Sequence, residues 1–300
     1  IYAVAVGFGA GQKGQSTSAV AIGFNAGQIQ QQASSIAIGP QAGWSNQGVQ
    51  SVAIGNLAGL SNQGAQAVAI GYQAGQTSQA AFGVSVGYQA GQASQGSQTV
   101  AIGYQSAYQN QGTQSISIGA LGTGYNAQGA QSIAIGTSAA NTIQGQSAIA
   151  IGNGTAYTRQ GNYGIAIGNN TATNYQGTNS VAIGYSAGGN YQGSNAIAIG
   201  CNTASAYQGS NAIAIGFNAG VSYQSTNSVA IGTYAGFSTQ QQYAIAIGFF
   251  VEFGASSMGA VVFLVFTAQY LIFAALGGAT PGHRIMGLKI VRFSDGQMPT

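Results

Sequence analysis

The sequence predicts an all-β fold, a parallel β-solenoid with one turn for every 16 residues. The main evidence is a five-residue phrase, Ala/Ser-Ile/Val-Ala-Ile/Val-Gly, which recurs sixteen times with little drift. Every step between its closing glycines is 16 residues, except the 17-residue step from Gly119 to Gly136. Such a fixed period is typical of stacked repeats, in which each unit buries its apolar side against its neighbours. These glycines, called anchor glycines below, are Gly7, Gly23, Gly39, Gly55, Gly71, Gly87, Gly103, Gly119, Gly136, Gly152, Gly168, Gly184, Gly200, Gly216, Gly232 and Gly248.

Each phrase reads as a short β-strand. In the unit that starts at Ser147, Ile149 and Ile151 share one face of an extended segment, and Ala150 points to the other face. The flanking residues are Ile or Val in every unit, and β-branched residues favour strands. We expect a narrow coil, with the Ile/Val pairs filling the interior and the alanine face left in water. Burial of that flat face against other copies then predicts a homo-oligomer, most simply a homotrimer.

A glutamine also recurs once in every unit. One glutamine on each rung can stack amide on amide, with each side chain donating to the next and accepting from the one before. The alternative is a row of exposed amides that binds a ligand, but the strict recurrence favours a structural column. Its members include Gln160, Gln176, Gln192, Gln208 and Gln224, and the anchor glycines of the same region are Gly168, Gly184, Gly200 and Gly216.

The composition excludes several classes of function. Only 2% of the residues are charged, and residues 1–248 contain Lys13 and Arg159 but no Asp, Glu or His. General acid–base catalysis and metal binding therefore have no candidate residues in the repeats, and we expect neither an enzyme nor a cofactor. A formal net charge of +3 spread over 300 residues is no nucleic-acid footprint. The single cysteine, Cys201, permits no disulfide within the chain.

Phrases such as 51–55, 180–184 and 228–232, all Ser-Val-Ala-Ile-Gly, resemble the head repeats of trimeric autotransporter adhesins. The resemblance covers about residues 1–248. It implies a left-handed parallel β-roll with three chains side by side, displayed at a cell surface and binding host surfaces. Similar repeats also occur in viral and phage surface fibres. The array departs from the adhesin pattern in its longer unit, its Gln-Gly corner and its lack of charge.

Aromatic residues are the remaining candidates for contact with a partner. One line follows the anchor glycines, as at Phe24, Tyr72 and Tyr185. A second line precedes the column glutamine at Tyr175, Tyr191, Tyr207 and Tyr223, each 16 residues from the next. Tyrosine is a good contact residue with little side-chain entropy to lose. The same line is explained equally well by rings that stack and stabilise neighbouring rungs.

The composition changes after Gly248, so we expect a second region over residues 249–300. Met258–Leu276 is 19 residues without a charge, long enough as a helix to cross a bilayer. A buried helix of a soluble domain is the alternative, although such a helix rarely stays apolar on every side. Basic residues follow it at Arg284, Lys289 and Arg292, which predicts that this end is cytoplasmic and the repeats are outside.

Residues 278–292 and the pair Asp295-Gly296 resemble part of the RDD family of bacterial integral membrane proteins. In that family a Thr-Pro-Gly-Lys-Arg segment follows a transmembrane helix, and here the segment reads Thr-Pro-Gly-His-Arg with His283 in place of lysine. The match covers about residues 250–300. It implies a transport-related membrane role, and the family's arginine and aspartate pair, which lie in an earlier helix, are missing. The joining of two unrelated pieces, or a truncated reading frame, also explains the change in composition.

These observations predict a non-enzymatic, surface-exposed fibre that mediates attachment or forms a coat. Its expected partners are further copies of itself and a host or environmental surface made of protein or glycan. The alternative is an RDD-like integral membrane protein with a transport-related role and a repetitive ectodomain. The lack of charge in the repeats argues against nucleic acid as a partner.

Overall fold

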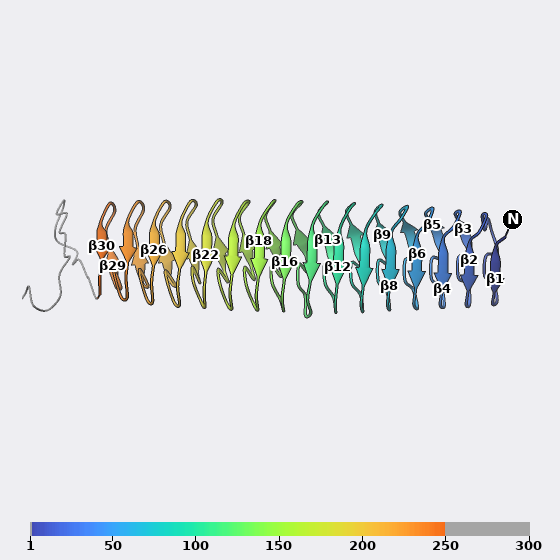
Figure 1. The fold of residues 1–300 in the computed structure, drawn as a ribbon, viewed down its shortest axis with the longest axis horizontal. Coiled ribbons are helices and arrows are strands. Elements are labelled where there is room, and N and C mark those ends of the chain that lie inside the picture. The colour runs from blue at the N-terminus through green and yellow to red at the C-terminus, as the bar shows by residue number, and fades with distance from the viewer. Residues whose placement is uncertain (1, 250–300) are drawn as a thin grey trace, which may run out of the picture. The chain divides into compact units, whose positions relative to one another are not determined.

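The computed structural model describes residues 2–249, which form a parallel β-solenoid built from thirty short strands (Figure 1). The all-β solenoid expected from the repeat is therefore confirmed for this part of the chain. Within residues 2–249 there is no helix of a length and apolarity that would cross a bilayer. The apolar segment Met258–Leu276 and the RDD-like residues 250–300 lie outside the described residues.

The strands form two sheets, and each rung contributes one strand to each sheet over most of the array. Sheet A has sixteen strands, each made by the Ile/Val-Ala-Ile/Val part of the phrase. They are β1 (Val4–Val6), β2 (Val20–Ile22), β4 (Ile36–Ile38), β6 (Val52–Ile54), β8 (Val68–Ile70), β10 (Val84–Val86), β12 (Val100–Ile102), β14 (Ile116–Ile118), β16 (Ile133–Ile135), β18 (Ile149–Ile151), β20 (Ile165–Ile167), β22 (Val181–Ile183), β24 (Ile197–Ile199), β26 (Ile213–Ile215), β28 (Val229–Ile231) and β30 (Ile245–Ile247).

Sheet B has fourteen strands, and each one ends at the recurring glutamine. They are β3 (Ile29–Gln31), β5 (Ser45–Gln47), β7 (Ser61–Gln63), β9 (Thr77–Gln79), β11 (Ala93–Gln95), β13 (Gln109–Gln111), β15 (Ala127–Gln128), β17 (Ile143–Gln144), β19 (Arg159–Gln160), β21 (Tyr175–Gln176), β23 (Tyr191–Gln192), β25 (Tyr207–Gln208), β27 (Tyr223–Gln224) and β29 (Thr239–Gln240). The strands of sheet B have three residues up to β13 and two residues from β15 onward.

Strands stack parallel and in register, so that equivalent residues of successive rungs lie over one another. In sheet A, Val181 pairs with Ile197 and Ala182 with Ala198. In sheet B, Tyr191 pairs with Tyr207 and Gln192 with Gln208. The 17-residue step keeps this alignment in sheet A, where Ile116 pairs with Ile133. The vertical alignment expected from the 16-residue period is therefore confirmed.

The expectation that Ile and Val fill the interior is wrong. The middle alanine of the phrase, Ala182 for example, is fully buried, and the flanking Val181 and Ile183 are half-buried. The same inversion holds along sheet A from β2 onward. The exposed fraction is 36–38% at Ile22, Ile70, Ile102, Ile167 and Ile231. Alanine columns therefore form the core, and the branched side chains lie on the outer face of sheet A.

The physical reason is the small distance between the two sides of a 16-residue coil. A Cβ atom added to Gly188 would lie 3.3 Å from the Cβ of Ala182 and 3.2 Å from the Cδ of Gln192. Two side chains and a glycine backbone from three parts of one rung thus meet around a single point. An isoleucine does not fit in such an interior, whereas alanine, serine and a glutamine lying along the coil do.

The anchor glycine makes the sharp corner that follows each strand of sheet A. Gly184 has a φ of +126°, and a Cβ atom placed there would overlap the carbonyl oxygen of Gly200 on the next rung. Only glycine adopts this conformation without strain and lets the next rung approach so closely. This explains why the closing residue of the phrase never varies.

Candidate functional site

The glutamine column runs through the interior and hydrogen-bonds both sheets together. Gln192 is fully buried, and its Nε2 donates to the carbonyl oxygen of Val181 at 2.7 Å and to that of Ala196 at 3.3 Å. The same Nε2 also donates to Oε1 of Gln208 on the next rung at 3.2 Å. Each such amide therefore satisfies backbone carbonyls that a narrow alanine core would leave without a donor.

The amide-to-amide bonds are interrupted at several rungs. One unbroken run of amide-to-amide hydrogen bonds links Gln176 through to Gln240, with donor–acceptor distances of 3.1–3.2 Å. Ser85, which replaces an alanine of the core, takes part in the column by accepting from Gln79 at 3.1 Å and donating to Gln95 at 2.8 Å. Among the described residues, buried Oε1 atoms have no hydrogen-bond partner at Gln31, Gln47, Gln128, Gln144 and Gln176.

The tyrosine column Tyr175–Tyr191–Tyr207–Tyr223 lies on the outer side of sheet B. Successive rings are parallel, with interplanar angles of 4–6° and centroid separations of 4.9, 4.9 and 4.6 Å. Because each ring covers the face of its neighbour, the surface displays ring edges and phenol hydroxyls. A sugar that stacks flat on an aromatic face therefore finds no open face within the column. The guanidinium carbon of Arg159 lies 5.6 Å from the centroid of Tyr175 and covers the first ring of the column.

The backbone of sheet B explains why this column lies where it does. In the strands of sheet B from β3 to β13, the residue before the column glutamine has a φ of 52–56° and is Gln, Asn or Ser. From β15 onward that residue is extended and is Ala, Ile, Arg, Tyr or Thr. Small polar residues adopt the left-handed region at lower cost than bulky or β-branched ones. Bulky side chains therefore alternate with the glutamines only in the second half of the array.

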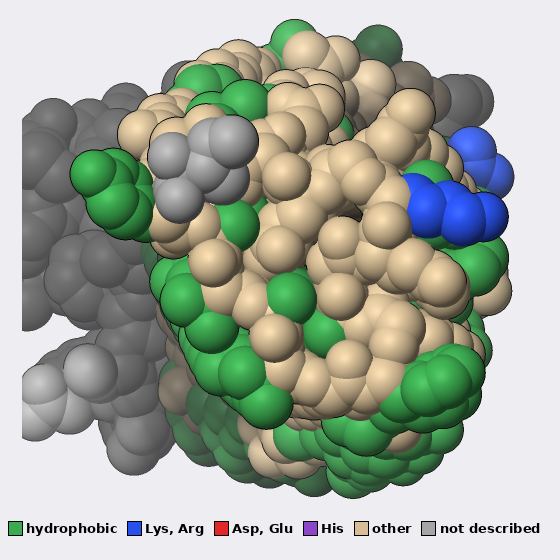
Figure 2. All heavy atoms as spheres, turned by 90° about the vertical axis from the view of Figure 1, so that its right-hand side faces the viewer, with side chains coloured by type: hydrophobic (Ala, Val, Ile, Leu, Met, Phe, Trp, Pro, Cys, Tyr) green, Lys and Arg blue, Asp and Glu red, His purple; other side chains and the backbone are tan. Residues whose placement is uncertain are grey.

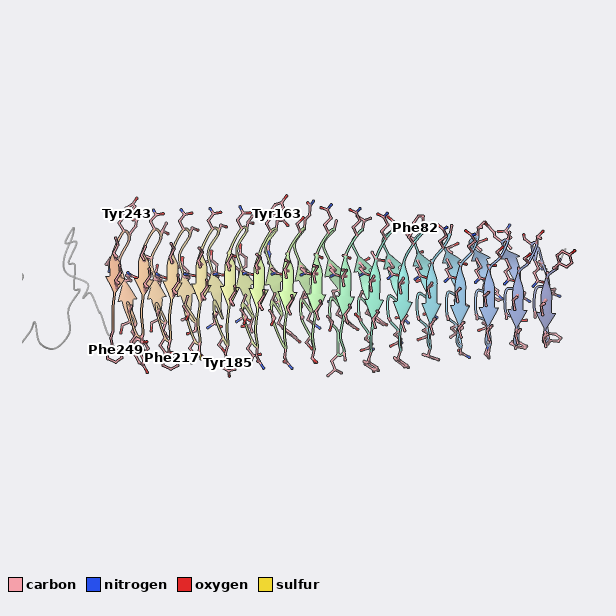
Figure 3. The ribbon with its side chains drawn as sticks, in the orientation of Figure 1. Phe82, Tyr163, Tyr185, Phe217, Tyr243 and Phe249 are labelled. Atoms are coloured by element: carbon pink, nitrogen blue, oxygen red, sulfur yellow. The ribbon has the colours of Figure 1, made fainter. Side chains whose placement is uncertain are left out.

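A second set of aromatic residues lies at the corner after the anchor glycine. Tyr72, Tyr88 and Tyr104 stack with centroid separations of 5.1 Å, and each is 42–45% exposed. Figure 3 shows Tyr185, Phe217 and Phe249 at this corner and Phe82, Tyr163 and Tyr243 at the opposite one. Seen from the N-terminal end, hydrophobic side chains gather mainly along the lower edge of the solenoid, and polar atoms cover most of the rest (Figure 2).

The chemistry open to this surface is limited almost entirely to neutral contacts. Lys13 and Arg159 are the only charged side chains in residues 2–249. No three His, Cys, Asp or Glu side chains gather into a metal site in this part of the chain. Cys201 is a free thiol at one corner. The described surface can therefore offer amides, hydroxyls, ring edges and the Ile/Val stripe of sheet A to a partner.

Tyr207 gives the column a pH dependence. Its pKa is raised above the ordinary 10.0, first by desolvation and then by the neighbouring Tyr223 and Tyr191, whose phenolates would repel a third negative charge. The unfolded chain then loses this proton at a lower pH than the folded chain does. The contribution of Tyr207 to the free energy of unfolding is constant below about pH 10 and falls as the pH rises through the raised pKa.

We therefore expect the alkaline loss of stability to be smaller in Tyr207→Phe than in the unaltered chain. Phenylalanine keeps the stack and removes the titrating group. The measurement is the urea midpoint of both chains between about pH 8 and pH 11. Identical pH profiles of the two chains would contradict this assignment.

The structure places the residues singled out from the sequence in three groups. The column glutamines lie inside, where they contact both sheets. The anchor glycines form one corner, and the four tyrosines lie outside on sheet B. Sequence reasoning missed the outward Ile/Val stripe of sheet A. The signal for it was the middle position of the phrase, which admits only alanine or, at Ser85 and Ser117, serine.

Comparison with known proteins agrees with the repeat architecture. Two stretches of the chain, residues 160–187 and 208–235, match the model of the YadA head domain repeat. No curated protein matches the chain. Among solved structures, one similar chain is the collagen-binding domain of the Yersinia adhesin YadA. That likeness covers 92% of this chain and 98% of the other, at 16% identity and a TM-score of 0.21. A superposition this loose carries no argument.

Proposed function

We propose that this chain is a non-enzymatic, surface-exposed fibre of the adhesin-head type, which attaches its bearer to a surface or forms a coat. The observation that carries the proposal is the separation of two faces on one straight array. Sheet A presents a continuous half-exposed Ile/Val stripe, and sheet B presents neutral amides, hydroxyls and stacked tyrosines. The two matches to the YadA head domain repeat support the same class.

The Ile/Val stripe is the face that we propose for self-association. Its apolar side chains are more than a third exposed at rungs spread along the whole array and so form a long patch, and such patches mark interfaces. Three copies arranged about an axis parallel to the array would bury the stripe of each in a closed symmetric assembly. Sheet B and its tyrosine column would then face outward. In this arrangement the alanine face has no role in assembly, because it lies inside each chain.

The self-association is tested by sedimentation of the chain and of a variant with Val181→Ser, Ile183→Ser, Ile197→Ser and Ile199→Ser. We expect the unaltered chain to sediment as a trimer and the variant to dissociate while keeping its β circular dichroism. The matched control replaces four outward polar residues of sheet B with alanine and should remain trimeric. A monomeric unaltered chain would rule out this interface.

The attachment role is tested by binding of the chain to immobilised protein and glycan surfaces. We expect Tyr191→Ala combined with Tyr207→Ala to weaken binding, because these rings lie in the middle of the outward column. Tyr163→Ala is the matched control, since Tyr163 is exposed but lies at a corner away from the column. Binding should barely change with ionic strength, because the surface is almost uncharged. A steep salt dependence, or equal losses in both variants, would refute the role of the column.

We further propose that the array lies outside a membrane and that Met258–Leu276 anchors it. The support for this is the sequence alone, through the length of the uncharged segment and the basic residues that follow it.

A further inference from the structure

The rung between Gly119 and Gly136 differs from the others in length, backbone and interior. We propose that this rung is a built-in boundary, at which the array opens first and across which residues 2–118 and 136–249 unfold as separate cooperative units. This inference goes beyond the function proposed above and does not depend on it. It is carried by three observations on the same rung, of which the first is the backbone.

The extra residue of this rung is Gly122, which has a φ of +81°. On the rungs before and after, the residue two past the anchor glycine donates its N–H to the rung before it. Examples are Gln105 to Tyr88 at 2.8 Å and Ser138 to Ala120 at 3.1 Å. Within the described array, no such bond joins the equivalent Leu121 to Tyr104. Leu121 is also 62% exposed. The insertion therefore removes one inter-rung hydrogen bond and pushes an apolar side chain into solvent.

The glutamine column is broken at the same rung, as it also is at other rungs, where the buried Oε1 atoms of Gln31, Gln47, Gln144 and Gln176 have no partner. Nε2 of Gln95 donates to Oε1 of Gln111 at 2.9 Å, but no such bond joins Gln111 to Gln128 in the described array. Gln111 donates only to the carbonyl oxygens of Val100 and Ser115, and the buried Oε1 of Gln128 has no partner in this part of the chain. An unpaired buried acceptor weakens the contact between two rungs. In sheet B these rungs share the single pair Gln111–Gln128.

The apolar core is interrupted there as well, and a second interruption lies between Ala74 and Ala90, where Ser85 replaces the core alanine. A small cluster around Ala90, Ala101 and Ala107 is separate from the large alanine cluster that begins at Ala134. Between them the core positions are filled by Ser117 and Thr123. The Oγ of Ser117 donates to the carbonyl oxygen of Thr123 at 2.8 Å. Hydroxyl groups have replaced the methyl contacts that join most other rungs.

Two side chains of the next rung hold the insertion in place. The Oγ of Ser138 donates to the carbonyl oxygen of Leu121 at 2.7 Å, and Nδ2 of Asn141 donates to that of Gly122 at 2.9 Å. Sheet A crosses the rung unbroken, since Gly136 donates to Ile118 at 2.9 Å. The boundary is therefore a weakened interface, closed by two polar contacts, in an otherwise continuous sheet.

The consequence follows from the way repeat arrays hold together. Their stability is close to a sum of terms for single repeats and for interfaces between neighbours, so a weak interface uncouples the segments on its two sides. Local opening concentrates where buried contacts are few. Among the described rungs, only this one combines a missing inter-rung backbone bond, an unpaired column amide and an interrupted core. The array would therefore open at this rung first and keep the rest intact.

The test is hydrogen–deuterium exchange of the intact chain, read by mass spectrometry. We expect amides of residues 119–131 to exchange at least about tenfold faster than those of the matched rung 184–195. Under mild denaturant, peptides on the two sides of the boundary should exchange in two separate steps. A single concerted step for the whole array, or equal protection of the two rungs, would overturn the proposal.

Four variants sharpen the result. Deletion of Gly122 restores the 16-residue period and should bring the exchange of this rung down to that of its neighbours. Ser138→Ala combined with Asn141→Ala should speed exchange at the boundary, and Ser186→Ala, at the position of Ser138 in another rung, should not. Insertion of one glycine after Ser186 should create a second fast rung there. If neither the double variant nor the insertion changes the exchange, the boundary does not control opening.

Discussion

Replacing Gln192 with alanine is expected to destabilise the array by about 4 kcal/mol. The variant removes the donor to the carbonyl oxygens of Val181 and Ala196 and leaves Oε1 of Gln208 without its partner. It also leaves a cavity, because Gln192 is fully buried. Unfolding by urea, followed by circular dichroism, measures the change.

Two further variants separate the causes. Gln192→Met keeps the volume and removes the hydrogen bonds, so we expect it to cost about 2 kcal/mol. Gln109→Ala is the matched control, because Gln109 is an exposed glutamine of β13, and its effect should stay within about 0.5 kcal/mol. Equal effects of Gln192→Ala and Gln109→Ala would mean that the column does not stabilise the fold.

Replacing Ala182 with leucine is expected to cost about 3 kcal/mol or to prevent folding of the surrounding rungs. Ala182 is fully buried, and the interior around it is closed by Gln192 and the backbone of Gly188. A larger side chain has to displace one of these. The measurement is again the free energy of unfolding, together with the recovery of soluble chain.

The matched control for this prediction is Ala206→Leu. Ala206 comes just before β25 and is partly exposed, so the added atoms can point to solvent and the effect should be within about 0.5 kcal/mol. If Ala182→Leu were tolerated as well as Ala206→Leu, the alanine face would lie outside and the assignment of the core would be wrong.

The sequence was sufficient to predict the repeat, the two strands in each rung and their stacking in register, because these follow from a fixed period and from β-branched pairs. It did not reveal which face of the strand lies inside. A period of two separates the faces, and the common rule that aliphatic residues are buried then favours Ile183 over Ala182. That rule fails here because the coil is too narrow for a branched side chain.

The position of the tyrosine column could be predicted only in part. The 16-residue spacing of Tyr175 and Tyr191 places them over one another, and the structure stacks them at 4.9 Å. The closure of the ring faces and the change of backbone after β13 depend on conformations that the sequence does not state. Asn46 and Ser78, which precede the column glutamine with a positive φ, carried a hint, since asparagine favours that region.

The most direct test of the central claim is a solid-state NMR correlation spectrum of chains labelled with carbon-13 at glutamine, alanine and isoleucine. The claim is that alanine and glutamine fill the coil while isoleucine and valine lie outside it. It predicts cross-peaks between glutamine Cδ and alanine Cβ, as the positions of Gln192 and Ala182 require, and none between glutamine Cδ and the isoleucine side-chain methyls. Strong glutamine–isoleucine cross-peaks without glutamine–alanine ones would contradict it.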